Sequence, residues 1–462
     1  MKPGLPGIGD LRKLLKGNAL GVRLARGGVT ALSIRMASVA LAYLMFVVLA
    51  RTMAKDDFGQ FAFAFSLATF IAVVAALGQP ILVLRLIPVY QDENRQSLLK
   101  GLVRDSWVAV LFGGLIGAGL MILGSFVWGA LEGKSATYLF WAAPLMVAMA
   151  LARHQAYSMR GFGNIVLALA PRDIFWRVLV IVCAIALAYD GSMIPASTAI
   201  NLCTLTLTVI LISQLFAHPV THPGTLLKRG LQTDRTFWAQ ESKGLWAVTI
   251  AQAAGPNLSV VILGLILSPE ETGPFFAALR TATLLTLPLT AGALVGAPMI
   301  SRHYNAGQIR EMQKVLRYLV IGITAPVLVG LFLILLFGEM ILGLFSPEFV
   351  AARAALTVIA FGTLVNALSG PTGFIMNMTG HHRQYFVIMT VTQLAALLIL
   401  PIAAYYFGML GAAATVAAGM VSWNFWVWWW ARKNLSVDPT FYGVVEWLIG
   451  RNTPAVSPDE KA

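Results

Sequence analysis

Two six-residue stretches of this 462-residue sequence read alike and decide its architecture. Residues 56–61 read DDFGQF and follow the first long apolar stretch, and residues 270–275 read EETGPF and follow the seventh, 214 positions later. A second pair, MRG at 159–161 and MTG at 378–380, follows the fourth and tenth apolar stretches at an offset of 219. Each half therefore carries six apolar stretches in the same order. This predicts a parallel internal repeat, a recurring design among transporters, although Gly-rich turns can also resemble one another by chance.

The composition is typical of an integral membrane protein. Hydrophobic residues make up 58% of the chain and charged residues 11%, whereas soluble domains carry about 25% charged residues. The formal net charge of +13 does not indicate nucleic-acid binding, because there is no basic soluble domain and no aromatic platform for bases. Cys183 and Cys203 both lie in apolar stretches, which indicates buried thiols and neither a disulfide nor a metal site. The sequence predicts no cofactor.

Twelve apolar stretches are long enough to cross a membrane, which takes about 20 residues in a helix. Pro144 and Pro171 interrupt the fourth and fifth stretches, which are the least regular. We therefore predict an all-α polytopic membrane protein in which twelve transmembrane helices form two six-helix lobes around a central cavity. The predicted spans are residues 27–50, 59–84, 106–131, 137–153, 165–189, 194–217, 244–267, 272–300, 316–337, 351–377, 384–406 and 409–431.

Basic residues concentrate on one side of the predicted spans. If the N-terminus is cytoplasmic, the cytoplasmic segments hold 27 of the 33 Lys and Arg residues, whereas the outer loops hold only four. Because Lys and Arg favour the cytoplasmic side, both termini are predicted to be cytoplasmic. The predicted segments are an amphipathic N-terminus at 1–26, a first lobe at 27–217, a cytoplasmic linker at 218–243, a second lobe at 244–431 and a cytoplasmic tail at 432–462.

Two arginines, Arg35 and Arg280, lie inside the first and eighth predicted spans. A guanidinium in hydrocarbon costs at least about 2.5 kcal/mol on insertion scales, so such residues usually face a protein-lined cavity or an anionic ligand. Arg280 lies about 12 Å from the predicted outer face at 1.5 Å per residue, a depth from which its side chain could also reach the interface. We interpret the two residues as the lining of a cationic chamber.

The chain resembles a known family in the region that follows the first span. The residues concerned are Leu49-Ala50-Arg51, Asp57-Phe58-Gly59, the Leu77-Gly78 turn, and Arg85-Leu86-Ile87-Pro88 with Tyr90. They are similar to the N-terminal signature of the Wzx-type polysaccharide exporters of the multidrug/oligosaccharidyl-lipid/polysaccharide flippase superfamily. Each motif is loose by itself, and the resemblance depends on their combination over all twelve spans.

The resemblance implies movement of an undecaprenyl-diphosphate-linked oligosaccharide across the bacterial inner membrane by alternating access, for O-antigen, capsule or exopolysaccharide synthesis. It implies Arg35 and Arg280 as the diphosphate site, because the related lipid II flippases are thought to use cavity arginines of their first and eighth helices. The planar guanidinium suits phosphate oxygens. The implied partners are the lipid-linked oligosaccharide, membrane lipids, a polysaccharide polymerase and a chain-length regulator.

Four further arginines lie near the cytoplasmic ends of predicted spans. Arg85, Arg153, Arg160 and Arg302 are predicted to form an electropositive vestibule that attracts the diphosphate, although positive-inside topology alone also places arginines there. Polar amides in apolar spans are the candidates for contact with the glycan, and they serve equally often as ties between helices. These amides are Gln252, Asn257, Asn366, Asn377 and Gln393.

The alternatives are a drug/cation antiporter of the same superfamily and a membrane polymerase or glycosyltransferase. An antiporter needs a carboxylate within the membrane, but Asp173 lies near a cytoplasmic span end and is expected to pair with Arg177, four residues on. The six histidines are expected at or near the cytoplasmic surface and offer no proton relay. An enzyme of this kind needs a sizeable outer loop with catalytic groups, and none stands out. We therefore predict a transporter and no enzyme.

Overall fold

The computed structural model describes residues 19–132, 137–226, 230–435 and 437–449. Every element in this part of the chain is helical, which confirms the all-α prediction. Nine of these helices are long and apolar enough to cross a membrane, so the chain is a multi-pass membrane protein. Most of the predicted amphipathic N-terminus, and the end of the predicted tail from residue 450, lie outside the described residues.

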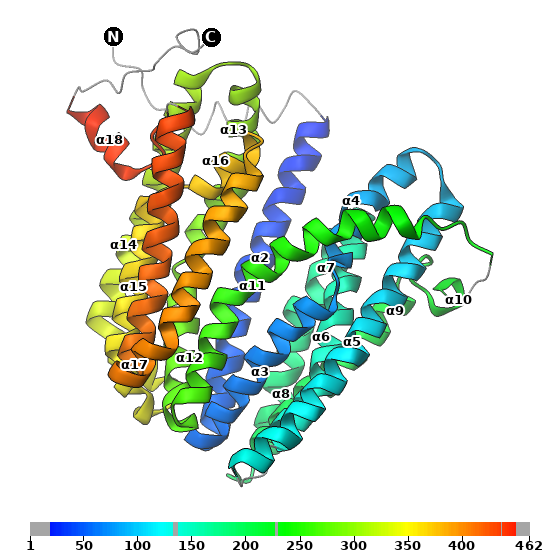
Figure 1. Cartoon of the computed structure of the whole chain (residues 1–462), viewed down its shortest axis with the longest axis vertical. Coiled ribbons are helices and arrows are strands. Elements are labelled where there is room, and N and C mark those ends of the chain that lie inside the picture. The colour runs from blue at the N-terminus through cyan, green and yellow to red at the C-terminus, as the bar shows by residue number, and fades with distance from the viewer. Residues whose placement is uncertain (1–18, 133–136, 227–229, 436, 450–462) are drawn as a thin grey trace.

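The first half of the chain forms one group of helices, drawn at the centre and right of Figure 1. Leu77 and Gly78 separate the second and third of them, because both residues have a positive φ, of 51° and 72°, which ends a right-handed helix. The predicted span 59–84 is therefore two helices. The group comprises α2 (Ala19–Thr52), α3 (Lys55–Ala75), α4 (Gln79–Asp92), α5 (Gln96–Glu132), α6 (Thr137–Gly161), α7 (Ile165–Ala170), η1 (Pro171–Phe175), α8 (Trp176–Leu187), α9 (Ala196–Phe216) and α10 (Pro223–Leu226).

The second half forms another group, at the left of Figure 1. Gly408 interrupts its longest helix with φ 57° and ψ −144°, and the chain turns back there, so the two arms of α17 match the predicted spans 384–406 and 409–431. The group comprises α11 (Arg235–Ile266), α12 (Pro269–Leu284), α13 (Leu287–Asn305), α14 (Ile309–Gly343), η2 (Pro347–Ala352), α15 (Arg353–Leu368), α16 (Thr372–Met378), α17 (His382–Leu435) and α18 (Phe441–Leu448).

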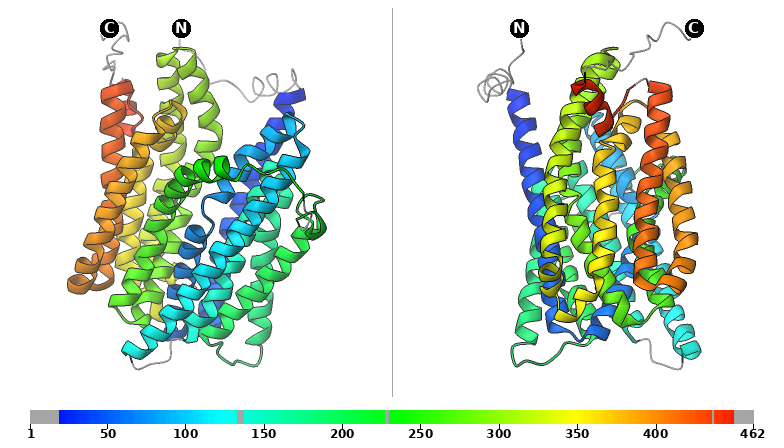
Figure 2. Two further views of the ribbon diagram at one scale, coloured as in Figure 1. Left: turned by 45° about the vertical axis from the view of Figure 1, so that its right-hand side comes forward. Right: turned by 90° about the vertical axis from the view of Figure 1, so that its left-hand side faces the viewer.

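The two groups converge at one end of the molecule. We call the end at which α2 begins and α17 ends the terminal end, and the opposite one the distal end (Figures 1 and 2). At the distal end Gly59 of α3 packs so closely on α12 that a Cβ atom there would collide with the carbonyl of Pro269. A Cβ atom on Gly273 would lie 3.3 Å from the backbone nitrogen of Gly59. The two copies of the repeated sequence therefore form the contact between the groups.

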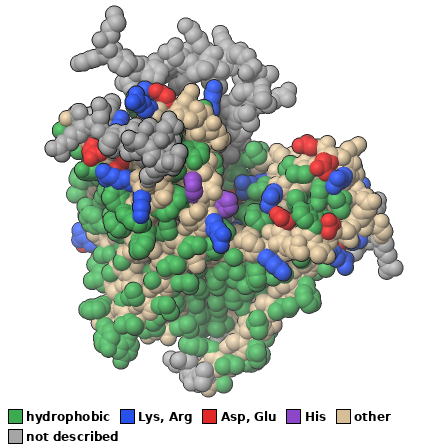
Figure 3. All heavy atoms as spheres, turned by 45° about the horizontal axis from the view of Figure 1, so that its top comes forward, with side chains coloured by type: hydrophobic (Ala, Val, Ile, Leu, Met, Phe, Trp, Pro, Cys, Tyr) green, Lys and Arg blue, Asp and Glu red, His purple; other side chains and the backbone are tan. Residues whose placement is uncertain are grey.

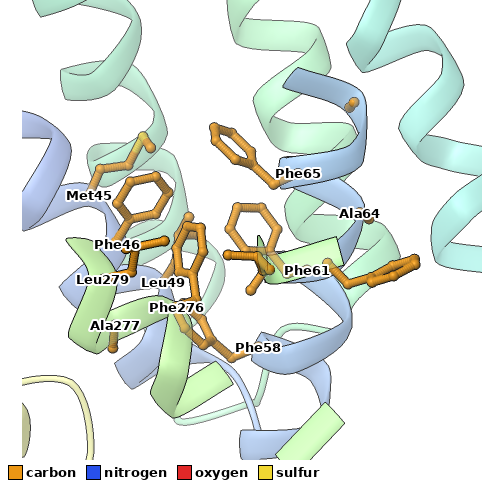
Figure 4. Packing of buried hydrophobic residues seen from close by; sticks show 14 of the residues in the cluster. Met45, Phe46, Leu49, Phe58, Phe61, Ala64, Phe65, Phe276, Ala277 and Leu279 are labelled. Atoms are coloured by element: carbon orange, nitrogen blue, oxygen red, sulfur yellow. The ribbon is translucent and has the colours of Figure 1, made fainter. Parts of the chain in front are cut away.

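Aromatic rings fill the same end and form what we call the distal seal, made of Phe46, Phe58, Phe276 and Phe349 (the first three are labelled in Figure 4). Phe46 of α2 meets Phe276 of α12 edge-on at 4.9 Å between ring centroids, and Phe58 of α3 lies 6.0 Å from Phe276 and 5.4 Å from Phe349 of η2. All four side chains are buried. Burial of such rings contributes strongly to hydrophobic packing.

Helix α11 runs from the first group to the second (Figure 1). It begins at Arg235, within the predicted linker 218–243, and its first turns lie on the first group. The indole nitrogen of Trp238 donates to the hydroxyl of Tyr90 at 3.0 Å, and that of Trp246 donates to the carbonyl of Val74 at 2.8 Å. The C-terminal part of α11 packs on α12 and α17. This helix therefore connects the two groups mechanically.

Candidate functional site: an arginine series above the distal seal

The surface at the terminal end is hollowed between the two groups of helices, and Lys, Arg and His side chains lie at the rim of this hollow (Figure 3). We call this space the chamber. The distal seal closes the opposite end. Arginines on α2, α6, η1, α8 and α12 interact electrostatically in pairs, and we call them the arginine series. The pairs are Arg153 with Arg172, Arg172 with Arg177, and Arg177 with Arg35 and Arg280.

Arg280 lies nearest to the distal seal. Its Cζ atom is 4.5 Å from the ring centroid of Phe276, one helical turn earlier on α12, and 5.4 Å from that of Phe46 on α2. Its Nε is buried without a hydrogen-bond partner, and within the described residues the guanidinium forms no ion pair. Cation–π contacts of this kind contribute about 0.5–2 kcal/mol, and the side chain is half-buried.

Arg177 on α8 is the best-connected arginine of the series. It donates through Nη1 to the backbone carbonyl and the Oγ of Ser38 on α2, the latter at 2.5 Å, and to the carbonyl of Asp173 at 2.8 Å. Its Nη2 lies 3.9 Å from Oδ1 of Asp173, which confirms the predicted pair. The positive charges of Arg35 and Arg280 both act on it. Arg177 is therefore close enough to interact electrostatically with both predicted site residues.

A π-helical turn, η1, directly precedes α8 and carries Asp173, the partner of Arg177. Pro171 begins this turn between α7 and α8, and its missing N–H removes one helical hydrogen bond. Such wider turns are frequent at functional sites. The sequence predicts that Asp173 pairs with Arg177, but it does not assign Arg177 to the site. Two signals were available, because Arg177 lies twelve residues inside the predicted span 165–189 and Pro171 precedes it.

Arg35 on α2 is exposed. It precedes Ser38, the acceptor of Arg177, by one helical turn, so both lie on one face of α2. The hydrogen bonds of Ser38 show that this face is turned toward α8. The structure thus brings Arg35 and Arg280 into a common series through Arg177.

Arg153 and Arg160 extend the series toward the terminal end. Both lie on α6, where their guanidinium carbons are 5.5 Å and 5.1 Å from the ring centroid of Tyr157, which stands between them in the sequence. The charge of Arg172 on η1 acts on Arg153. Neither Arg153 nor Arg160 forms an ion pair within the described part of the chain, so their charges remain available to an anion.

The other two predicted vestibule residues have different environments. Arg85 on α4 forms an ion pair of 2.8 Å with Glu241 on α11, and 63% of its side chain is exposed. It therefore ties α4 to α11, and its charge is neutralised. Arg302 is exposed in the last turn of α13, in the second group.

The five amides proposed to face the glycan differ in exposure and in hydrogen bonding. Gln252 and Asn377 are exposed. Asn257 is buried and donates to the carbonyl of Ala253 in its own helix at 2.8 Å. Asn366 accepts a 2.9 Å hydrogen bond from Asn424 and so ties α15 to α17, whereas Oε1 of Gln393 is buried without a partner. Contact with a glycan stays a prediction for all five.

One histidine is not where the sequence placed it. His154 is fully buried, and its Nε2 lies 3.1 Å from Oγ of Ser106 on α5, so it packs between α5 and α6 and not at the surface. The expectation failed because a helix that ends near the surface still turns one face into the bundle.

Comparison with known proteins gives the family and the fold. The family model described as polysaccharide biosynthesis protein matches residues 24–303, more than half of the chain. No curated protein matches the sequence. The fold is similar to the inward-facing conformation of a multidrug resistance MATE family transporter of the MOP superfamily, with a TM-score of 0.72 and 13% identity over 88% of this chain and 98% of that one.

Two further solved structures show the same fold. The outward-facing conformation of a multidrug resistance MATE family transporter has a TM-score of 0.63 at 14% identity, over 92% of this chain and 97% of that one. A MOP superfamily transporter from Pyrococcus furiosus, described by the reverse polarity of its binding pocket, has a TM-score of 0.64 at 14% identity over the same shares. The chain belongs to the polysaccharide biosynthesis protein family and has the fold of the MOP superfamily.

Proposed function

We propose that this protein is a flippase that moves an undecaprenyl-diphosphate-linked oligosaccharide from the cytoplasmic to the periplasmic leaflet of a bacterial inner membrane, for O-antigen, capsule or exopolysaccharide synthesis. Arg280 supports this most strongly, because its buried Nε has no hydrogen-bond partner among the described residues. A cation at membrane depth without an acidic neighbour is costly. An anionic ligand with several acceptor oxygens, such as a diphosphate, compensates that charge.

The arginine series suggests how the diphosphate travels. Arg160 and Arg153 receive it at the terminal end, Arg177 and Arg35 hold it halfway, and Arg280 binds it last, above the distal seal. Each transfer exchanges one guanidinium for the next, so the diphosphate never enters bare hydrocarbon. Arg302 belongs to the rim of the chamber in this scheme, and Arg85 has a structural role because Glu241 neutralises it.

The topology proposed from the sequence fits this path. The nine long apolar helices give twelve crossings when α6, the unit of α7, η1 and α8, and the second arm of α17 are added, and the terminal end is then the cytoplasmic one. The two groups correspond to the lobes at 27–217 and 244–431, with cytoplasmic segments at 1–26, 218–243 and 432–462. With this topology the distal seal closes the periplasmic side, and we infer a state that receives substrate from the cytoplasm. Rocking of one lobe against the other then gives alternating access.

An anionic substrate agrees better with the site than a cationic drug does. Asp173 is the acidic residue of the series, and it is already paired with Arg177. A cation would meet the charges of at least four arginines there. For the glycan we retain the two exposed amides, Gln252 and Asn377, as the foremost candidates, and a polymerase in the periplasm is the expected consumer of the product.

A reconstitution experiment tests the proposal. The purified protein is reconstituted in liposomes that carry a fluorescent undecaprenyl-diphosphate-linked disaccharide in one leaflet. Appearance of this lipid in the other leaflet is followed with a membrane-impermeant quencher. We expect transfer of this lipid, and no transfer of a neutral polyprenyl disaccharide that lacks the diphosphate. Equal transfer of both lipids, or uptake of a lipophilic cation but not of the diphosphate lipid, would overturn the proposal.

A further inference from the structure

Arg280 belongs to two structures at once, the arginine series and the distal seal. Its guanidinium lies over the faces of Phe276 and Phe46. The same two rings contact each other at 4.9 Å, and Phe276 contacts Phe58 of the first group at 6.0 Å. Phe46, labelled beside Phe276 in Figure 4, comes from the first group and Phe276 from the second. The cation therefore stabilises a contact between the groups.

Among the described residues, two ring faces are the contacts that the structure gives for this guanidinium. Its Nε has no hydrogen-bond partner, and no carboxylate pairs with it in the part of the chain that the structure describes. Aromatic faces attract a cation through their quadrupole, whereas phosphate oxygens attract it through full charge and bidentate hydrogen bonds. A diphosphate that reaches Arg280 will therefore displace the rings as its partner. Because the N–H donors of a guanidinium lie in its own plane, a diphosphate that arrives from the side of Arg177 attracts the group along that plane and away from the two rings.

We propose that Phe46 and Phe276 are positioning residues for Arg280, and that the anion of the substrate opens the distal seal by drawing this guanidinium away from the two rings. Without an anion the cation bridges the rings and the seal stays closed. With an anion bound, the seal loses that bridge and the two groups can separate at the distal end. The inference extends the proposed function, since it takes the diphosphate as the anion.

Other rings of the seal provide a matched control. Phe349 of η2 lies 5.4 Å from Phe58 and 6.1 Å from Phe345, and it forms no contact of this kind with Arg280. It is buried to the same degree as Phe276, at 1% and 0% exposure. Replacing Phe349 by Leu removes packing from the seal without removing a partner of the cation. Replacing Phe276 by Leu removes both.

The experiment reports opening of the distal end. Cys183 and Cys203 are replaced by Ala, and Thr272→Cys provides a single thiol in the first turn of α12, where Thr272 is fully buried. Labelling with a membrane-impermeant maleimide from the distal side of proteoliposomes is measured without ligand, and with undecaprenyl diphosphate added from the terminal side. Binding of undecaprenyl diphosphate is measured separately on each variant.

We expect the ligand to raise the labelling rate in the Cys-substituted parent. Phe276→Leu and Arg280→Ala should label about fivefold faster without ligand, as expected for loss of a cation–π contact, and should show little further response. Phe276→Tyr keeps the ring and should restore the parental response. Phe349→Leu should raise basal labelling but keep the fold increase on adding ligand. If Phe276→Leu does not fold, Phe46→Leu tests the same contact.

The outcomes separate this inference from the proposed function. Failure of the parent to bind undecaprenyl diphosphate would overturn both. Binding and transport with an unchanged ligand response in Phe276→Leu would overturn the inference alone. Equal loss of the response in Phe349→Leu would also overturn it, because packing and not the cation would then control the seal.

Discussion

Gly59 and Gly273 occupy equivalent positions of the two halves and pack against each other at the distal end, where a Cβ atom on Gly273 would lie 3.3 Å from the backbone nitrogen of Gly59. Small residues permit such close approach of helices in a membrane. The repeated sequence thus forms both sides of one helix–helix contact, and in each half its glycine permits the close approach.

Alanine at these two positions should have unequal effects. A Cβ atom on Gly59 would collide with the carbonyl of Pro269, whereas one on Gly273 requires only a small shift. We expect Gly59→Ala to destabilise the closed distal end by about 1–3 kcal/mol, the usual cost of overpacking. Labelling of Thr272→Cys from the distal side measures this, with Gly273→Ala as the milder control. Equal labelling of Gly59→Ala and the parent would contradict the prediction.

Removal of Arg35 or Arg280 should abolish export while the protein remains in the membrane. A hydrogen bond to a charged group contributes about 1.5–3 kcal/mol, so Arg280→Ala and Arg35→Ala should each lower transport at least about tenfold. The measurement is polymer display at the cell surface, with immunoblotting of the membrane fraction. Arg310→Gln serves as the control, since Arg310 is exposed at the start of α14. Full display by both Ala variants would refute the site.

Arg177 should prove as important as Arg35, although the sequence did not indicate this. Arg177→Gln removes the cation that interacts with both Arg35 and Arg280, and we expect a loss of transport of about tenfold or more. Ser38→Ala is the matched control, because it removes one hydroxyl acceptor but leaves the Ser38 carbonyl in place. That variant should lose only about 0.5–1.5 kcal/mol of stability, measured by thermal unfolding in detergent. Normal transport by Arg177→Gln would exclude it from the path.

Arg85 should be dispensable for transport, in contrast to Arg153. The Arg85–Glu241 pair is largely exposed on the Arg85 side, and exposed pairs contribute about 0–1 kcal/mol. A double-mutant cycle with Arg85→Gln and Glu241→Gln measures its coupling energy in thermal unfolding, and the transport assay compares Arg85→Gln with Arg153→Gln. We expect a clear defect in Arg153→Gln alone. A larger transport defect in Arg85→Gln than in Arg153→Gln would show that Arg85 belongs to the vestibule.

The all-helical membrane fold could be predicted from apolar stretch length, because a helix that crosses a bilayer must satisfy its own backbone and be apolar throughout. The breaks within helices were harder to place. Leu77 and Gly78 could be identified as a turn, but the predicted span 59–84 continued through it, because hydropathy does not register a change of φ. The turn at Gly408 separated two predicted spans as expected.

The candidate site could be predicted only in part, for a similar reason. Arg35 and Arg280 stand alone in apolar stretches and are visible in the sequence. Arg177 lies in a stretch that Pro171 interrupts, so it was counted with the cytoplasmic arginines. The pairing of Arg85 with Glu241, 156 positions apart, and the stacking of Arg280 on Phe46 are long-range contacts. No local pattern encodes them.

Membrane potential should drive transport without a coupled ion. A diphosphate carries about two negative charges outward, and an inside-negative potential favours this by about 2.3 kcal/mol per charge per 100 mV. The acidic residue of the arginine series, Asp173, is held by Arg177 and is not free to carry a proton.

In liposomes with a potassium gradient, valinomycin should accelerate transfer of the diphosphate lipid when the cytoplasmic side becomes negative and slow it when the sign is reversed. A pH gradient imposed at zero potential is the control and should leave the rate unchanged. Transfer that follows the pH gradient and ignores the potential would show proton coupling, and would require an acidic group other than Asp173.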